Sequence, residues 1–264
     1  MKTRKNAVPM MAAAAVLWWG GAALAAGPTS ITTSKHNFQL STNNVYTTGL
    51  EDGLCVFCHT PHKGASSLLL WNHQLSANDY SWKDVGTGGK TTGGTTYPTN
   101  LKTWSGSTKK CLSCHDGTVS VGAIYWSNAT APADLPMAGS DQTAGRINNT
   151  AFIIPAGQAA ASADGTDLSG NHPVGVPYSY TNVTATYNGI TTGANVRLNQ
   201  WVATPGNIDG TGVKIFGAGG AGNPVAGAAG IECASCHDPH GTGNEFFLRV
   251  TKSGSRLCLS CHVK

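Results

Sequence analysis

The chain is short of charged residues. Asp, Glu, Lys and Arg make up 11% of its 264 residues, against about 25% in ordinary globular proteins. Its formal charge of +4 falls to +1 when the N-terminal basic residues Lys2, Arg4 and Lys5 are removed. So small a net positive charge gives no indication that the protein binds the phosphates of a nucleic acid. We therefore expect no nucleic-acid partner.

Long apolar runs are also missing after the N-terminal segment. That segment has a basic start, an apolar run over residues 10–19 and the small residues Ala23–Ala25, a pattern typical of a cleaved signal peptide. An uncleaved anchor is the alternative, because residues 8–26 are just long enough to span a bilayer. The small residues favour cleavage. We predict a signal peptide at 1–25, an exported mature chain and no transmembrane segment after cleavage.

No cysteine is left over for a disulfide framework. The cysteines pair as Cys55 and Cys58, Cys111 and Cys114, Cys233 and Cys236, and Cys258 and Cys261, and the pairs are followed by His59, His115, His237 and His262. Two thiols at this spacing form thioethers with one haem, and the following histidine binds the iron. Zinc ribbons and redox dithiols also use Cys-x-x-Cys, but neither requires a histidine after every pair. The motifs predict four covalently bound haem c groups.

Methionine, the other common axial ligand of haem iron, is scarce. Met1, Met10 and Met11 leave with the signal peptide, so Met137 alone remains. Five histidines lie outside the motifs: His36, His62, His73, His172 and His240. Five candidates for four irons predict bis-histidine ligation at every haem, with low reduction potentials.

Sequence context sorts the five histidines. His62 and His240 each follow a motif histidine by three residues, and a side chain so placed cannot easily reach over its own haem. We expect His62 to bind the second iron, His240 the fourth and His172 the third. The remaining ligand is His36 or His73. We favour His36, which lies on a polar arm near the new N-terminus and could reach a neighbouring molecule, whereas His73 follows a tryptophan and suits packing.

Composition predicts a mostly irregular fold whose core is formed by the haems. Glycine accounts for 34 residues, close to twice its usual share. We expect one tetrahaem cytochrome domain at 26–264, with short helices at the haem motifs. Haems I and II lie at 55–115 and haems III and IV at 233–262, separated by a cysteine-free region at 120–230. In that region Asn188-Gly189 predicts a small β-hairpin with a type I′ turn.

Several segments resemble bacterial multihaem cytochromes with a doubled haem-binding motif. They are Cys58-His59-Thr60-Pro61-His62, Leu70-Trp71-Asn72-His73, Cys114-His115-Asp116-Gly117, Asn171-His172-Pro173, Cys236-His237-Asp238-Pro239-His240 and Phe247-Leu248-Arg249. With four motifs, a signal peptide and a Ser34-Lys35-His36 arm, the chain is similar to the outer-surface tetrahaem cytochromes of metal-reducing bacteria. That resemblance implies polymerisation of identical copies into extracellular filaments, in which an axial histidine can come from the next subunit.

Three functions compete. The first is an extracellular conductive filament, or nanowire, that passes electrons to redox-partner cytochromes or to acceptors such as metal oxides. The second is a monomeric electron shuttle in the periplasm. The third is a multihaem reductase, which needs an iron with an open or weakly held site. Because the chain has enough histidines to close every iron, we expect an electron carrier rather than an enzyme.

Overall fold

The computed structural model describes residues 30–49, 53–61, 70–80, 106–126, 133–154, 168, 171–178, 184–191, 202, 212–217, 227–241 and 243–263. In these ranges the backbone is mostly irregular, with short helices and small antiparallel sheets. This agrees with the irregular fold predicted from the composition. None of the helices in the described ranges is long and apolar enough to cross a membrane.

Every haem motif lies on a short helix, as the sequence predicts. The four helices are η2 (Leu54–Phe57), α1 (Ser107–His115), α3 (Cys233–Cys236) and α4 (Arg256–Leu259). Three further helical turns are η1 (Ile31–Thr33), η6 (Glu245–Phe247) and η7 (Ser253–Ser255). Helical residues three apart share a face, so the two cysteines of a motif point the same way, as attachment to one haem requires.

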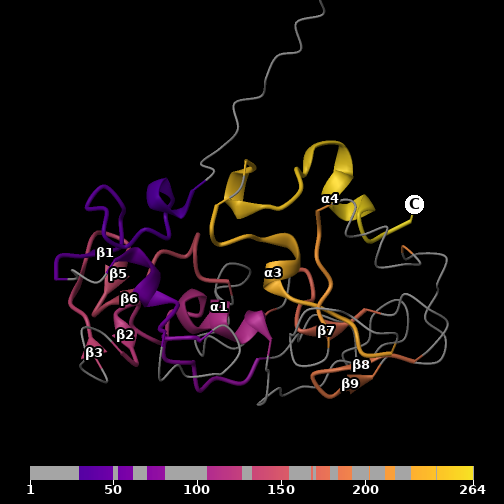
Figure 1. The fold of residues 1–264 in the computed structure, drawn as a ribbon, viewed down its shortest axis with the longest axis horizontal. Coiled ribbons are helices and arrows are strands. Elements are labelled where there is room, and N and C mark those ends of the chain that lie inside the picture. Colours follow the sequence, from indigo (N-terminus) through magenta and orange to yellow (C-terminus); the bar gives the residue numbers. More distant parts are fainter. Residues whose placement is uncertain are drawn as a thin grey trace, which may run out of the picture.

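Within the described residues, each strand is two residues long, and the strands form two-stranded antiparallel sheets. The pairs are β1 (Tyr46–Thr47) with β4 (Met137–Ala138), β2 (Ala123–Ile124) with β3 (Ala133–Asp134), β5 (Gln142–Thr143) with β6 (Arg146–Ile147), β7 (Val176–Pro177) with β10 (Gly230–Ile231), and β8 (Thr186–Tyr187) with β9 (Ile190–Thr191). Strands β1, β2, β3, β5 and β6 lie on one side of α1, and β7, β8 and β9 lie on the other (Figure 1). Helix α1 therefore occupies the middle of the molecule.

The predicted hairpin is present at β8–β9. Asn188 and Gly189 connect the strands with φ of 48° and 76°, the two positive values of a type I′ turn. A second hairpin, β5–β6, has the same geometry at Ala144 (φ 50°) and Gly145 (φ 76°). The sequence did not predict it, because alanine at the first position carries no turn signal.

The buried apolar side chains of the described residues form three small clusters rather than one large hydrophobic core. One contains Phe38, Phe57, Val121 and Ile147, with Cys58 and Cys114 packed against them. The second contains Tyr80, Leu112, Leu168, Val176 and Ile190, and the third contains Tyr178, Val213, Ile215, Ala229, Ile231 and Val250, with Leu257 and Cys261. Motif cysteines thus pack against two of these three clusters.

Glu232 joins the helices of the second and third motifs. Its carboxylate is completely buried and accepts hydrogen bonds from the backbone N–H of Thr108 at 2.8 Å and the hydroxyl of Tyr187 at 2.7 Å. The same side chain caps α3 through the N–H of Ser235. A Cβ at Gly106 would overlap the carboxylate, so the close approach needs glycine there. One acid therefore satisfies the N-terminal N–H groups of two helices.

Replacing Glu232 by Ala leaves these buried donors without an acceptor. We expect the free energy of unfolding of the haem-loaded protein to fall by about 2–4 kcal/mol, as measured by guanidinium denaturation followed by circular dichroism. Tyr187→Phe removes only one of the hydrogen bonds, so its expected cost is about 1 kcal/mol. Equal losses in the two variants would contradict a capping role for Glu232.

Candidate haem-binding site

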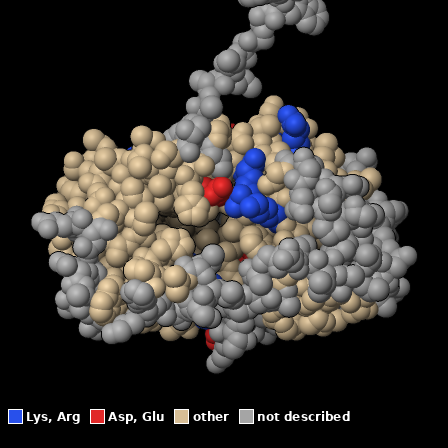
Figure 2. All heavy atoms as spheres, viewed as in Figure 1, with Lys and Arg blue, Asp and Glu red and all other residues tan. Residues whose placement is uncertain are grey.

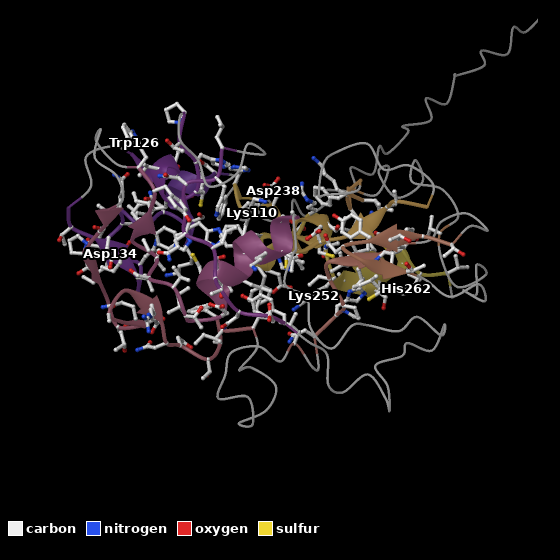
Figure 3. The ribbon with its side chains drawn as sticks, turned by 90° about the horizontal axis from the view of Figure 1, so that it is seen from below. Lys110, Trp126, Asp134, Asp238, Lys252 and His262 are labelled. Atoms are coloured by element: carbon white, nitrogen blue, oxygen red, sulfur yellow. The ribbon has the colours of Figure 1, made fainter. Side chains whose placement is uncertain are left out.

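Three pairs of histidine rings face each other at the same distance. The ring centroids of His36 and His115, of His59 and His240, and of His172 and His262 are each 6.2 Å apart. In every pair one histidine belongs to a Cys-x-x-Cys-His motif and the other lies outside the motifs. Figure 3 shows His262 in the C-terminal half of the molecule, away from the central helix α1, which carries Lys110.

This distance fits an iron held between two imidazoles. Metal–imidazole bonds are about 2.0 Å long, so two rings on opposite sides of one metal ion have centroids roughly 6.3 Å apart. The angle between ring planes is 66° for His36 and His115, 13° for His59 and His240, and 66° for His172 and His262. The residues present therefore suit bis-histidine ligation of haem iron.

Hydrogen bonds at Nδ1 fix the tautomer of several histidine rings, so that Nε2 is available to bind a metal. Backbone carbonyls lie near Nδ1 of His115 (Phe152, 2.7 Å), His172 (Pro173, 2.9 Å) and His237 (Phe246, 2.8 Å). A carbonyl at Nδ1 fixes the proton on that nitrogen and leaves the Nε2 lone pair for a metal.

His36 is further adapted to bind as a neutral ring. Burial, with a smaller contribution from His115, lowers the pKa of His36 to about 4. The imidazole is therefore uncharged at neutral pH. An uncharged imidazole is the form that binds a metal ion.

His73 has a different environment. It is buried, and its two ring nitrogens lie 2.7 Å from the carbonyl of Gln74 and 2.9 Å from the carbonyl of Ser120. Because both nitrogens are engaged with backbone oxygens, neither is directed toward a metal. His73 is therefore buried among backbone oxygens, whereas the His36 ring lies against the ring of a motif histidine.

The pairing differs from the assignment made from the sequence. His240 faces His59 of the first motif rather than the fourth motif, and His172 faces His262 of the fourth motif rather than the third. His62 lies outside the described residues. The His240 ring lies beside His59 rather than beside the histidine of the preceding motif, and spacing alone cannot identify which distant motif a loop will approach.

His36 also differs from the arm expected from the sequence. Its ring lies against His115 of the same chain, and its Nδ1 is 3.4 Å from the carbonyl of Pro239. The Asn37 side chain bonds Thr32, and that of Asn43 bonds Ser34, which folds this segment on itself. The segment from Thr32 to Asn43 therefore lies against its own chain.

The helices of the second and third motifs are neighbours in space. Helix α1 packs against α3, where the N–H of Cys233 donates to the Thr108 hydroxyl at 3.1 Å and the thiols of Cys111 and Cys233 lie close enough to influence each other. Cys58 and Cys114 border one apolar cluster. Motifs that are far apart along the chain therefore lie close together in the folded protein.

The buried thiols are poor thiolates. Burial, reinforced by neighbouring groups, raises the pKa of Cys58 and of Cys114 to about 12, and that of Cys236 to about 11. A redox dithiol depends on a lowered thiol pKa. These environments oppose that use of the Cys-x-x-Cys pairs and are compatible with thioether attachment.

Asp116 is a supporting residue that the sequence argument did not assign. Its buried carboxylate accepts hydrogen bonds from the hydroxyls of Ser76 (2.6 Å), Tyr80 (2.8 Å) and Thr118 (2.7 Å), and from the backbone N–H of Thr118. It follows His115 directly, so these bonds fix the end of α1. The available signal was an aspartate directly after a motif histidine, a position that Asp238 occupies after His237.

Comparison with known families supports the haem interpretation. Residues 223–264 match the family described as the doubled CXXCH motif. This match indicates a multihaem c-type cytochrome that binds haem covalently and functions in electron transfer. No curated protein matches the chain.

The plane angles predict two kinds of ferric signal in electron paramagnetic resonance. Nearly parallel imidazoles split the two iron orbitals that share the unpaired electron, which gives a rhombic low-spin spectrum. Strongly tilted rings leave these orbitals nearly degenerate, which gives one very large g value. We expect a rhombic signal from the His59–His240 pair at 13° and large-g signals from the two pairs at 66°. His240→Ala should therefore remove a rhombic signal. If it removes a large-g signal instead, the pairing is wrong.

Proposed function

We propose that the protein is an exported tetrahaem c-type cytochrome that carries electrons between bis-histidine haems. The three histidine pairs at 6.2 Å carry this proposal, because each joins a motif histidine to a histidine outside the motifs. His59 and His240 would hold haem I, His115 and His36 haem II, and His262 and His172 haem IV. The cysteines of each motif would attach the corresponding haem.

His62 is the remaining ligand for haem III. The four described histidines outside the motifs already contact other motif histidines or, for His73, backbone carbonyls. The iron bound by His237 still needs a second histidine. His240 lies three residues after His237 and faces His59, while His62 lies three residues after His59. We propose a reciprocal exchange in which the segment after each of these motifs supplies a ligand to the haem of the other.

The protein's own residues keep the proposed sites closed. Haem supplies one-electron chemistry between ferric and ferrous iron. Neutral imidazoles on both sides leave no position for a substrate, and two neutral nitrogen ligands favour the ferric state more than a histidine–methionine pair does. The packing of helix α1 against α3 brings the attachment points of haems II and III close together, so electrons could pass between these haems over a short distance.

A multihaem reductase is the competing function of a different class. It requires an iron with an exchangeable position, whereas the histidine pairs close each site for which both partners are described. Binding of cyanide or nitrite to the reduced protein would favour the reductase. An absence of such binding would support a carrier.

We also propose that copies of the chain assemble outside the cell. The signal peptide at 1–25, the resemblance to filament-forming cytochromes and the low content of charge support this. Few charged side chains lie on the described part of the face in Figure 2, and Leu259 and Val263 beside the fourth motif are exposed. Neutral surfaces of this kind lose little solvation when they are buried between subunits. On the proposed pairing of His36 with His115, assembly would not require His36 to bind a haem of a neighbouring molecule.

His36→Ala and His73→Ala separate the two candidate ligands. Both variants should retain four haems, because the thioethers remain, and intact mass spectrometry checks this count. We expect His36→Ala to produce one high-spin iron per chain, seen by optical and resonance spectra, and His73→Ala to produce none. His73→Ala should instead lower the free energy of unfolding by about 2–3 kcal/mol, because the buried carbonyls of Gln74 and Ser120 lose the imidazole beside them. The reverse spectroscopic result would overturn the ligand assignment.

Sedimentation of the secreted haem protein tests assembly. A filament should sediment far faster than a single processed chain with its haems, and electron micrographs should show continuous fibres. His36→Ala should assemble as the unchanged protein does. Material that remains single-chain at all concentrations would favour the periplasmic shuttle, and loss of assembly only in His36→Ala would restore the shared-ligand hypothesis.

A further inference from the structure

Two consecutive phenylalanines adopt an unfavourable backbone conformation. Phe246 and Phe247, in η6, have φ of 53° and 59°. Bulky side chains rarely occupy this left-handed region, and each residue held there carries backbone strain. The conformation persists only if the surrounding structure stabilises it, and such strain is often found at functional sites.

Both residues contact histidines of the proposed haem sites. The Phe247 ring stacks on the His36 ring with centroids 4.5 Å apart and planes 12° from parallel. The carbonyl of Phe246 accepts a hydrogen bond from His237 Nδ1 at 2.8 Å. The Phe246 ring itself is 68% exposed, so its side chain adds little to these contacts. The turn therefore links the distal ligand of haem II to the motif histidine of haem III.

The third motif holds this turn in place. The backbone N–H of Asp238 donates to the carbonyl of Phe247 at 2.7 Å, and the N–H of Arg249 donates to the carbonyl of Cys236 at 2.8 Å. The Arg249 guanidinium also bonds the Ala234 carbonyl at 2.9 Å and the Asp238 carboxylate at 3.2 Å. These bonds on both sides of the strained residues offset the cost of the two positive φ angles.

We propose that Phe247 is a positioning residue that sets the rotation of the His36 ring relative to haem II. This inference rests on the proposed ligation of that haem by His36. An iron bound at Nε2 lies in the plane of the imidazole, so a ring stacked on its face leaves Nε2 free. The same stack resists rotation of the imidazole about the iron–nitrogen bond. The Pro239 carbonyl, 3.4 Å from Nδ1, is too distant to fix this rotation strongly.

The rotation has an electronic consequence. The His36 plane lies at 66° to the plane of His115, which predicts a large-g ferric signal for haem II. If the stack is removed, the His36 ring can rotate while Nε2 still reaches the iron. The signal of haem II should then broaden or become more rhombic, and the reduction potential of that haem should change, because axial-ligand orientation is one of the protein's means of tuning iron.

Phe247→Leu in the haem-loaded full chain tests this role. Leucine retains apolar volume but cannot stack, so we expect a changed haem II signal with all four haems low-spin and the His172–His262 signal unchanged. Phe247→Tyr retains the ring and should give the original spectrum. Tyr125→Leu, which removes an exposed aromatic ring elsewhere, is the control and should leave every signal unchanged.

Two outcomes overturn the proposal: an unaltered haem II signal and potential in Phe247→Leu, or an equal change in Tyr125→Leu. If Phe247→Leu does not fold, Phe247→Tyr and Phe247→Trp still decide, because retention of a stacked ring predicts a large-g signal in both. His36→Ala distinguishes this failure from a failure of the ligand assignment. A high-spin iron in His36→Ala with no change in Phe247→Leu would reject only the positioning role.

Discussion

The architecture depends on the meeting of histidines that are remote in sequence. His59 faces His240 and His172 faces His262, so each pair connects parts of the chain that share no continuous sheet. The strands in the described ranges are only two residues long and provide few hydrogen bonds to hold these parts together. A metal-centred link between two imidazoles, reinforced by two thioethers, can replace that missing framework. On the proposed ligation, the cofactors hold the fold together as well as carrying its function.

Buried acids complete this arrangement at the ends of the motif helices. Glu232 accepts hydrogen bonds at the N-termini of α1 and α3, and Asp116 accepts several at the C-terminal end of α1. A buried carboxylate is costly unless donors surround it. Here the donors come from segments on both sides of the acid, so satisfying the charge also orients the motif helices. The strained turn at Phe247 uses a related principle, because local strain is offset by backbone bonds to the third motif.

On the proposed ligation, this organisation suits electron transfer. Catalysis at haem requires an open coordination position, whereas the observed ring pairs enclose one position for a metal between two imidazoles. On the proposed pairing, His36 binds a haem of its own chain, so complete ligation of the haems does not require a neighbouring molecule. Haem ligation and the assembly of many copies can therefore be tested independently.

The sequence by itself determined the local features. Cys-x-x-Cys-His is contiguous chemistry, so haem attachment and the short motif helices could be predicted, and Asn188-Gly189 specified its turn through the backbone freedom of those residues. Only the tertiary structure decided which histidines meet, because those contacts join loops far apart in sequence and leave no periodic signal. It also placed His73 between two backbone carbonyls, brought the helices of the second and third motifs into contact, and placed Phe247 on His36. Each of these results depends on long-range packing, which residue types and their spacing do not encode.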